Sequence, residues 1–258
     1  MRPTVYAHRG GAALAPENTL AAFDAGLAAG ADGIELDVRL SADGVPVLMH
    51  DPTLERTTNG SGPVDAHTAA DLACLDAGYR FERDGGFPFR GCGIGVPSLR
   101  DVFARHPEAP MLIELKVADA RLAEAVVAAI RDAGAAGRVT VGSFQKGGLE
   151  AVRALDAYIR TGADMDDVRN VLSGAAVHPV FEAFQVPEIH TGVRIVTPEF
   201  IARAHRAGVA VTVWTVNQED DMRRLLDWGV DCLITDRPDV AVPLVRAWTA
   251  ARASLAGR

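Results

Sequence analysis

Residues 33–49 read GIELDVRLSADGVPVLM, and this stretch decides the fold. It holds two runs typical of β-strands, Gly33–Val38 and Val45–Met49, with only a short connection between them. A connection between parallel strands needs about a dozen residues or more. The connecting residues 41–44 (SADG) instead have the chemistry of a tight turn. The two runs are therefore predicted to form an antiparallel hairpin.

The rest of the chain alternates short β-like runs with helical patterns. Helices are predicted over Pro16–Ala29, Asp119–Asp132, Thr197–Gly208 and Asn217–Gly229. Without the return strand of the hairpin, the β-like runs number eight, each followed by a helix. Eight such units in 258 residues predict an α/β fold, a (β/α)₈ TIM barrel forming a single domain over residues 1–258. Besides Gly33–Val38, the runs are Thr4–Ala7, Met111–Leu115, Arg138–Gly142, Ala157–Thr161, Ala183–Val186, Val209–Val216 and Cys232–Thr235.

The segment between the hairpin and the third parallel strand is too long for a barrel loop. Residues 52–110 contain several glycine-rich turns and no strong strand pattern. They are predicted to form a small inserted subdomain that follows the hairpin extension of the second strand.

Composition and charge exclude several classes of protein. The net charge of −8 argues against nucleic acid as a partner, because phosphate backbones attract basic surfaces. The sequence has no apolar run of about 18 residues, so no membrane span is expected, and no secretory signal is visible at the start. The three cysteines, Cys74, Cys92 and Cys232, are widely spaced. We interpret them as reduced thiols of a cytoplasmic protein.

Two of the predicted strands carry acidic residues where a buried barrel strand should be apolar. Side chains alternate along a strand, so Glu35 and Asp37 share one face, and Glu114 and Lys116 share another. Both faces are predicted to point into the barrel. Three carboxylates in one cavity repel each other unless a cation lies among them. Oxygen ligands of this kind suit Mg²⁺, Ca²⁺ or Mn²⁺. The alternative is a buried ion-pair network of the acids with Lys116 and Arg9.

Two histidines are predicted at the same end of the barrel. His8 ends the first strand, and the hairpin register sets His50 beside Glu35. Catalysis in TIM barrels takes place at the carboxyl ends of the strands, so the two histidines are candidates for a general acid–base pair. The other histidines are expected to be structural or exposed to solvent: His67, His106, His178, His190 and His205.

Four more residues lie near strand ends. Two of them have a structural and a functional interpretation, and the other two have only a structural one. Phe144 and Trp214 lie at the ends of strands near the barrel mouth, where they either pack in the core or shape a substrate pocket. Asn217 and Asp236 are expected to cap helices.

Several motifs, in this order, resemble the glycerophosphodiester phosphodiesterase family. The resemblance spans the chain, although the glycine-rich residues 85–95 depart from the usual pattern. The motifs are His8-Arg9-Gly10, Pro16-Glu17-Asn18-Thr19, Glu35-x-Asp37, His50-Asp51, residues 56–64 (RTTNGSGPV), Glu114-Leu115-Lys116, residues 213–217 (VWTVN) and residues 234–238 (ITDRP).

This resemblance implies a role for each candidate residue. One divalent cation, Mg²⁺ or Ca²⁺ with Mn²⁺ also compatible, would be held by Glu35, Asp37 and Glu114. His8 and His50 would be the catalytic acid–base pair. Arg9 and Lys116 would contact the phosphate, and Phe144 and Trp214 the glycerol.

The reaction implied is hydrolysis of a glycerophosphodiester, a small-molecule substrate, to sn-glycerol 3-phosphate and an alcohol. Attack by water and attack by the substrate's own hydroxyl, giving a cyclic phosphate, both stay open. The alternatives are a lysophospholipase D-like hydrolase, a metal-dependent barrel aldolase or isomerase, and a non-catalytic binding barrel. The aldolase or isomerase would have no need of the two histidines.

Overall fold

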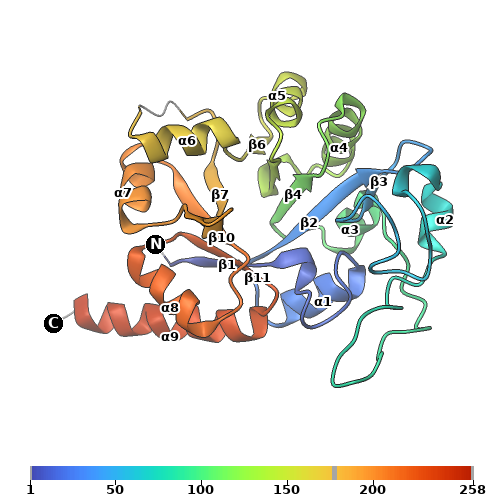
Figure 1. Ribbon diagram of the computed structural model, residues 1–258, viewed down its shortest axis with the longest axis horizontal. Helices are drawn as coiled ribbons and strands as arrows, with labels where there is room; N and C mark the ends of the chain where they lie inside the picture. The colour runs from blue at the N-terminus through green and yellow to red at the C-terminus, as the bar shows by residue number, and fades with distance from the viewer. Residues whose placement is uncertain (1, 176–178, 257–258) are drawn as a thin grey trace.

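The computed structural model describes residues 2–175 and 179–256 (Figure 1). In this part of the chain, eight parallel strands and one antiparallel strand form a single sheet, in the order β6-β5-β4-β2-β1-β11-β10-β7 with β3 paired to β2. A parallel bridge between Gly162 and Ala183 links the two ends of this order, so the barrel is nearly closed. The predicted TIM barrel is confirmed. The parallel strands are β1 (Thr4–Ala7), β2 (Gly33–Leu40), β4 (Met111–Leu115), β5 (Val139–Gly142), β6 (Arg160–Thr161), β7 (Ala183–Pro187), β10 (Ala210–Trp214) and β11 (Cys232–Thr235).

The predicted hairpin is confirmed as well. Strand β3 (Pro46–Leu48) runs antiparallel to β2, with Val38 opposite Leu48, one residue away from the predicted register. Three parallel strands are shorter than predicted. The run Arg138–Gly142 begins one residue later, at Val139. The run Ala157–Thr161 narrows to Arg160–Thr161, because the residues before it form the turn that follows helix α5 (Lys146–Leu155). The run Val209–Val216 narrows to Ala210–Trp214.

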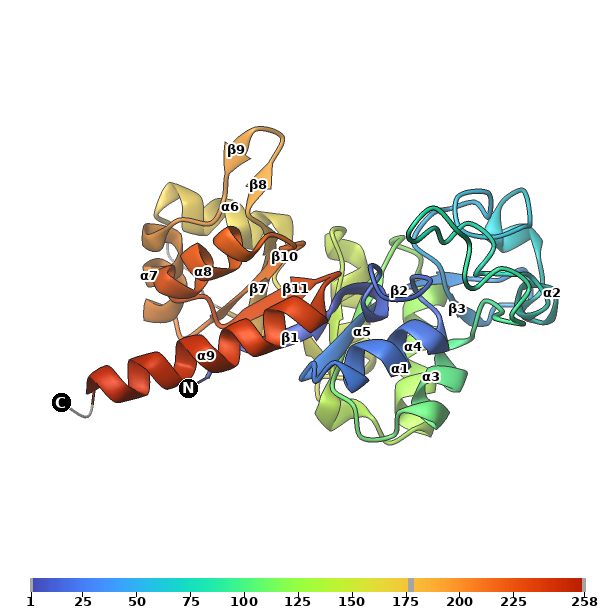
Figure 2. The ribbon, with the colours of Figure 1, turned by 90° about the horizontal axis from the view of Figure 1, so that it is seen from below.

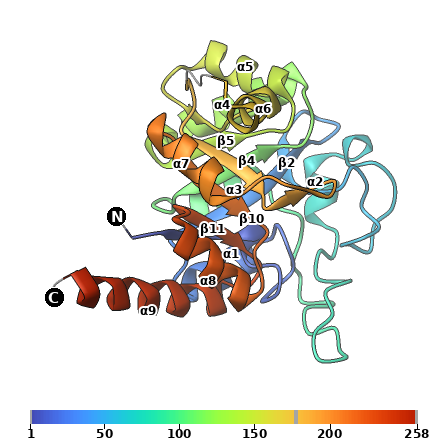
Figure 3. The same ribbon diagram turned by 60° about the vertical axis from the view of Figure 1, so that its left-hand side comes forward.

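Each parallel strand is followed by a helix that covers the outside of the barrel (Figure 3). Short elements complete the chain: the 3₁₀ turns η1 (His8–Gly10), η2 (Val64–Ala66) and η3 (Ala136–Arg138), helix α2 (Ala69–Ala73), and the hairpin β8 (Ile189–His190) with β9 (Val193–Arg194), which stands out from the body in Figure 2. The barrel helices are α1 (Leu20–Ala28), α3 (Leu99–Arg105), α4 (Ala120–Asp132), α5 (Lys146–Leu155), α6 (Met165–Ser173), α7 (Pro198–Arg206), α8 (Glu219–Trp228) and α9 (Pro238–Ala256).

Helix starts follow the capping residues, with two corrections. Asp119 caps α4 and Thr197 caps α7, as predicted. Helix α1, however, begins at Leu20 rather than at Pro16, because the Thr19 hydroxyl accepts the hydrogen bond from the backbone N–H of Ala22. Helix α8 is preceded by Gln218, so the predicted cap at Asn217 is wrong.

The apolar core lies between the sheet and the helices in two large clusters, one around β2, β4 and β5 and the other around β7, β10 and β11. Inside the barrel, Gly142 and Gly162 leave room for the side chain of Gln185, whose Oε1 would lie within 2.7 Å of a Cβ added to either glycine. No helix within the described ranges is long and apolar enough to cross a membrane.

Part of the predicted insertion has a core of its own. Val47 and Met49 at the end of the hairpin pack with apolar residues of the following segment, Leu54, Val64, Leu72, Ala77 and Val96. Helix α3, which the predicted range of 52–110 includes, packs instead into the cluster around β2 and β4. The division of the chain into one domain with an inserted unit over 52–110 stays a prediction.

Gly10, in the turn after β1, provides a test of this packing. Its φ is +90°, and an added Cβ would lie 2.7 Å from Ala22 and Phe23 of α1. Gly10→Ala is therefore expected to lower the free energy of unfolding by about 3 kcal/mol or more. The control is Gly44→Ala, because Gly44 also has a positive φ (+77°) but has nothing within 4 Å of the added carbon. That variant should lose about 1–2 kcal/mol. Urea denaturation of both variants checks this, and equal losses would contradict the packing argument.

Candidate active site

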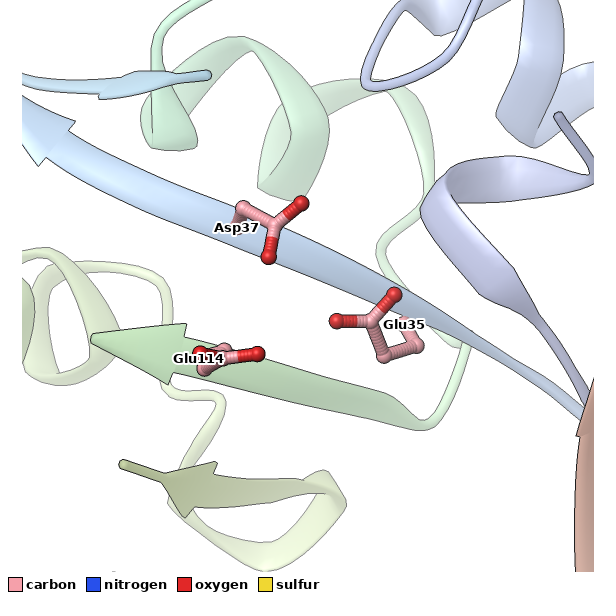
Figure 4. A group of neighbouring side chains, drawn as sticks. All are labelled: Glu35, Asp37 and Glu114. Atoms are coloured by element: carbon pink, nitrogen blue, oxygen red, sulfur yellow. The ribbon is translucent and has the colours of Figure 1, made fainter. Parts of the chain in front are cut away.

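Three carboxylates meet inside the barrel at the carboxyl ends of β2 and β4. Asp37 on β2 lies directly opposite Glu114 on β4 in the parallel register, and Glu35 lies two residues before Asp37. Ligand oxygens of the three side chains lie within 4.8 Å of one another (Figure 4). Glu35 and Asp37 are buried, with 4% and 1% of their surface exposed. The sequence-based prediction that these side chains converge is confirmed.

The pKa values of these groups reflect burial and mutual repulsion. Burial and the charge of Asp37 raise the pKa of Glu35. Burial also raises the pKa of Glu114, against the opposing effect of Lys116. For Asp37 the balance is reversed: burial would raise its pKa, but the charges of Arg9 and Lys116 hold it below the usual value. Proton binding by Glu35 and Glu114 is thus favoured when no further cation is present.

Both predicted cationic residues contact this acidic cluster. The Nζ of Lys116 lies 2.8 Å from Oε1 of Glu114 and 3.4 Å from Oδ1 of Asp37. The Nε of Arg9 lies 3.2 Å from Oδ2 of Asp37, and the backbone N–H of Arg9 donates to Glu35 at 2.9 Å. Because Arg9 also pairs with Glu17 at 2.8 Å, Arg9 and Lys116 together do not balance the negative charge of the three carboxylates.

His8 lies beside the cluster and is held by a carboxylate from the far end of the chain. Its Nδ1 lies 2.7 Å from Oδ1 of Asp236, and its Nε2 lies 3.9 Å from Oε2 of Glu35. Burial alone would lower the pKa of His8, but the Asp236 hydrogen bond and the charge of Glu35 raise it above its usual value. A carboxylate on Nδ1 leaves Nε2 as the nitrogen that can exchange a proton with a ligand.

Asp236 does not cap a helix, which corrects the prediction for it and for Asn217. The amide of Asn217 donates to Oδ2 of Asp236 at 2.6 Å, and its carbonyl oxygen accepts from the backbone N–H of Asp236 at 2.9 Å. The hydroxyl of Thr235 also donates to this side-chain oxygen of Asn217, Oδ1, at 3.1 Å. Asn217 thus orients the carboxylate that orients His8.

His50 has an anchor of the same kind. Its Nδ1 lies 2.6 Å from Oδ1 of Asp51, and its carbonyl oxygen accepts two hydrogen bonds from Arg39, at 2.8 and 3.0 Å. Both histidines line one cavity, together with Glu35 and Glu114. The structure therefore brings the two predicted histidines and the acidic cluster to one site.

The cavity has a volume of about 270 Å³ and an apolar side facing the charged one. Phe144 and Trp214 both line it, packed edge to face with ring centroids 5.5 Å apart. Both residues thus line a pocket, and Trp214 also packs against the buried side chains of Leu112, Cys232 and Ile234. His190 on β8, expected to be structural or solvent-exposed, is exposed and also lines this cavity. His178 lies outside the described residues.

Asn18 contacts the acidic cluster, although the sequence predicts it to lie in the first turn of a helix. Its Nδ2 donates to Oδ2 of Asp37 at 2.8 Å, and its Oδ1 accepts from the backbone N–H of Asp37 at 3.1 Å. Its φ of +56° is one that asparagine tolerates better than most residues. The signal in the sequence was the motif Pro16-Glu17-Asn18-Thr19, which by itself assigns Asn18 no contact with Asp37.

The sequence model of the glycerophosphoryl diester phosphodiesterase family matches residues 8–240, which include every site residue described above. The chain belongs to this family. This match confirms the prediction that the chain belongs to the enzyme class of the glycerophosphodiester phosphodiesterases.

Relatives of the glycerophosphoryl diester phosphodiesterase family match over nearly their whole length. A glycerophosphodiester phosphodiesterase of Caldanaerobacter subterraneus subsp. tengcongensis is 33% identical, over 95% of this chain and 99% of that protein. The corresponding domain of a Mycobacterium tuberculosis protein has a TM-score of 0.81 at 26% identity, over 93% of this chain and 98% of that domain. A phosphodiesterase of Oleispira antarctica, solved in complex with the product sn-glycerol-3-phosphate, has a TM-score of 0.78 at 25% identity, over 95% and 97% of the two chains.

Asp236 can be tested as the anchor of His8. Asp236→Asn keeps the shape of the side chain but removes its charge and so weakens the preference for a proton on Nδ1 of His8. We expect kcat to fall by about 10²- to 10⁴-fold. Asp239→Asn is the matched control, because Asp239 pairs with Arg237 at the start of α9 and does not touch His8. Steady-state kinetics with glycerophosphocholine measure both variants, and equal activities would contradict the anchoring role.

Proposed function

We propose that the chain hydrolyses glycerophosphodiesters to sn-glycerol 3-phosphate and an alcohol, with one divalent cation and two histidines. The observation that carries this proposal is the single cavity lined by His8, His50, Glu35 and Glu114, with Asp37 buried directly behind the two glutamates in the same acidic cluster. The product bound to the Oleispira antarctica relative supports the choice of substrate.

The acidic cluster fits a hard divalent cation. All three side chains offer carboxylate oxygen, the ligand that Mg²⁺, Ca²⁺ and Mn²⁺ prefer, and none offers sulfur or nitrogen. The unbalanced negative charge of the cluster and the raised pKa of Glu35 and Glu114 point the same way. When bound, such an ion supplies positive charge to the phosphoryl oxygens.

Arg9 and Lys116 supply the remaining positive charge at the phosphate. Both line the cavity and sit against the acidic cluster, so a phosphodiester there meets fixed cations on one side. Negative charge on the non-bridging oxygens grows in the transition state, and preorganised cations stabilise that state more than the ground state.

His8 and His50 transfer the protons of the reaction. One takes a proton from the attacking hydroxyl and the other gives a proton to the departing alcohol. In each ring the carboxylate on Nδ1, from Asp236 or Asp51, assigns proton transfer to Nε2. Phe144 and Trp214, on the apolar side of the cavity, would hold the carbon skeleton of the glycerol and exclude water.

A lysophospholipase D-like activity is the second candidate. It is favoured by apolar side chains exposed beside the cavity mouth, where Phe144 is 43% exposed and where Ile189 and Val193 of the β8–β9 hairpin are 51% and 56% exposed. These residues could contact an acyl chain. Comparing turnover of lysophosphatidylcholine with that of glycerophosphocholine distinguishes the two activities, and a non-catalytic barrel would turn over neither.

We further propose a cytoplasmic protein without nucleic acid partners. Cys74 and Cys92 are exposed free thiols, and Cys232 is a buried one, a state that a reducing compartment maintains. The net charge of −8 disfavours binding to a phosphate backbone.

Chelation tests the metal requirement. EDTA is expected to abolish hydrolysis of glycerophosphocholine, and excess Mg²⁺, Mn²⁺ or Ca²⁺ should restore it. Without a bound cation, the three carboxylates would repel the negatively charged phosphodiester. The released alcohol is measured with and without chelator. Full turnover in excess EDTA would rule out the metal assignment.

Substitution tests the histidine roles. His8→Ala and His50→Ala should each lose about two to four decades of kcat, the usual contribution of a general acid or base. His205→Ala is the control, since His205 pairs with Asp231 at 2.8 Å and neither residue lines the cavity. Near-normal turnover in either site variant would exclude its role in proton transfer.

A further inference from the structure

Arg56, in the segment that follows β3, makes two forked contacts with acidic residues that in turn contact the site residues His50 and Arg9. The side edge of its guanidinium, Nε and Nη2, donates to both oxygens of Asp51, with Nη2 at 3.2 Å from Oδ1. The end of the guanidinium, Nη1 and Nη2, donates to both oxygens of Glu17 at 2.8 and 2.7 Å. One planar group thus binds two carboxylates at once.

Each of these carboxylates holds a different part of the site. Oδ1 of Asp51 lies 2.6 Å from Nδ1 of His50. Oε1 of Glu17 accepts from Nη1 of Arg9 at 2.8 Å. An unbroken series of contacts therefore runs from His50 through Asp51, Arg56 and Glu17 to Arg9.

The backbone that carries Arg56 is fixed in place. A bridge joins Thr53 to Pro63 at the base of the loop. Thr58 is fully buried, and its hydroxyl donates to the carbonyl of Leu54 at 2.8 Å. The side chain of Leu54 is itself buried in the apolar cluster of the segment. A rigid base of this kind lets a long side chain define the position of its partners.

Arg56 also controls the charge of its partners. Its hydrogen bonds are the largest cause that lowers the pKa of Asp51 to about 2. Burial would raise the pKa of Glu17, but hydrogen bonds from Arg56 and the charge of Arg9 hold that pKa below its usual value. Both carboxylates thus stay ionised, as they must to orient a histidine N–H and a guanidinium.

We propose that Arg56 is a positioning residue that couples the proton-transferring His50 to the phosphate-binding Arg9. The proposal rests on the proposed function, because it assumes that these two residues do that work. Without the guanidinium, Asp51 and Glu17 would be two neighbouring carboxylates that repel each other. Their separation would move His50 and Arg9 out of their common geometry.

The competing explanation is that Arg56 only fastens its segment to the barrel. Arg83 provides the matched control, since it lies in the same segment and donates to the barrel at the carbonyl of Leu14, at 3.2 Å, without reaching a site residue. A fastening role predicts that Arg56→Ala and Arg83→Ala behave alike, with lower thermal stability and unchanged kinetic constants.

The positioning role predicts a split between kcat and KM for glycerophosphocholine. Asp51→Asn should mainly lower kcat, and Glu17→Gln should mainly raise KM. Arg56→Ala should do both, with a loss in kcat/KM of about 10²-fold, the effect of a misplacement of about 1 Å in an active site. Arg56→Lys should stay impaired, because an ammonium has no second edge with which to bind a second carboxylate. Arg83→Ala should keep wild-type constants.

A double-mutant cycle decides whether Arg56 acts through Asp51. The loss in kcat from Arg56→Ala should be much smaller in the Asp51→Asn background than in the wild type, because the contact is already broken there. Losses that multiply, or an Arg56→Ala variant with wild-type kcat and KM, would overturn the proposal.

A binding measurement separates this proposal from the proposed function. Calorimetric titration with sn-glycerol 3-phosphate requires no turnover. Arg56→Ala should weaken binding about tenfold through the displaced Arg9, a loss typical of a residue that orients a ligand-binding group, and Arg83→Ala should not. If the wild type turned over no glycerophosphodiester, the proposed function would fail, and this comparison would still decide the role of Arg56. Equal affinities in the two variants would overturn that role.

Discussion

The parallel pairing of β2 with β4 is the constraint on which the rest of the site depends. It sets Asp37 opposite Glu114, with Glu35 on the same inward face, in a region from which water is largely excluded. Buried charges of one sign are costly unless they are compensated. Arg9 and Lys116 at the ends of two strands provide part of this compensation. The cluster is therefore a site of stored electrostatic repulsion, held together by the hydrogen bonds of the sheet.

Around this cluster the same arrangement, a histidine held by a carboxylate, occurs twice. His8 and His50 come from different strands, yet in both the Nδ1 nitrogen is bound by a carboxylate. Asp236 reaches His8 from the end of β11, whereas Asp51 directly follows His50. Two rings fixed in the same tautomer can exchange roles as acid and base according to which one carries the proton. A phosphodiester between them would meet a proton donor on one side and a proton acceptor on the other.

The period of two in the barrel strands made the fold and the first ligands of the site predictable. Alternation along residues 33–38 sent Glu35 and Asp37 inward, and the short turn before Val45 identified the return strand of the hairpin. What could not be predicted were the partners of the site residues. Asp236 was expected to cap α9, because the predicted barrel placed the last strand beside the first but did not fix which side chain at the end of that strand reaches His8. Asn18 was assigned to a helix, because only its positive φ, which tertiary contacts impose, turns its side chain toward Asp37.

The pairing of β1 with β11 determines when, during synthesis, the barrel can close and the site can form. The first strand pairs with the last, and His8 meets its carboxylate 228 positions further along the chain. During synthesis β1 has no partner on that side until residues 232–235 have left the ribosome. The contact is among the most distant in sequence that the chain can form, and its loop entropy opposes early closure. A nascent or truncated chain that ends before β11 therefore has all three acidic ligands but an unanchored histidine.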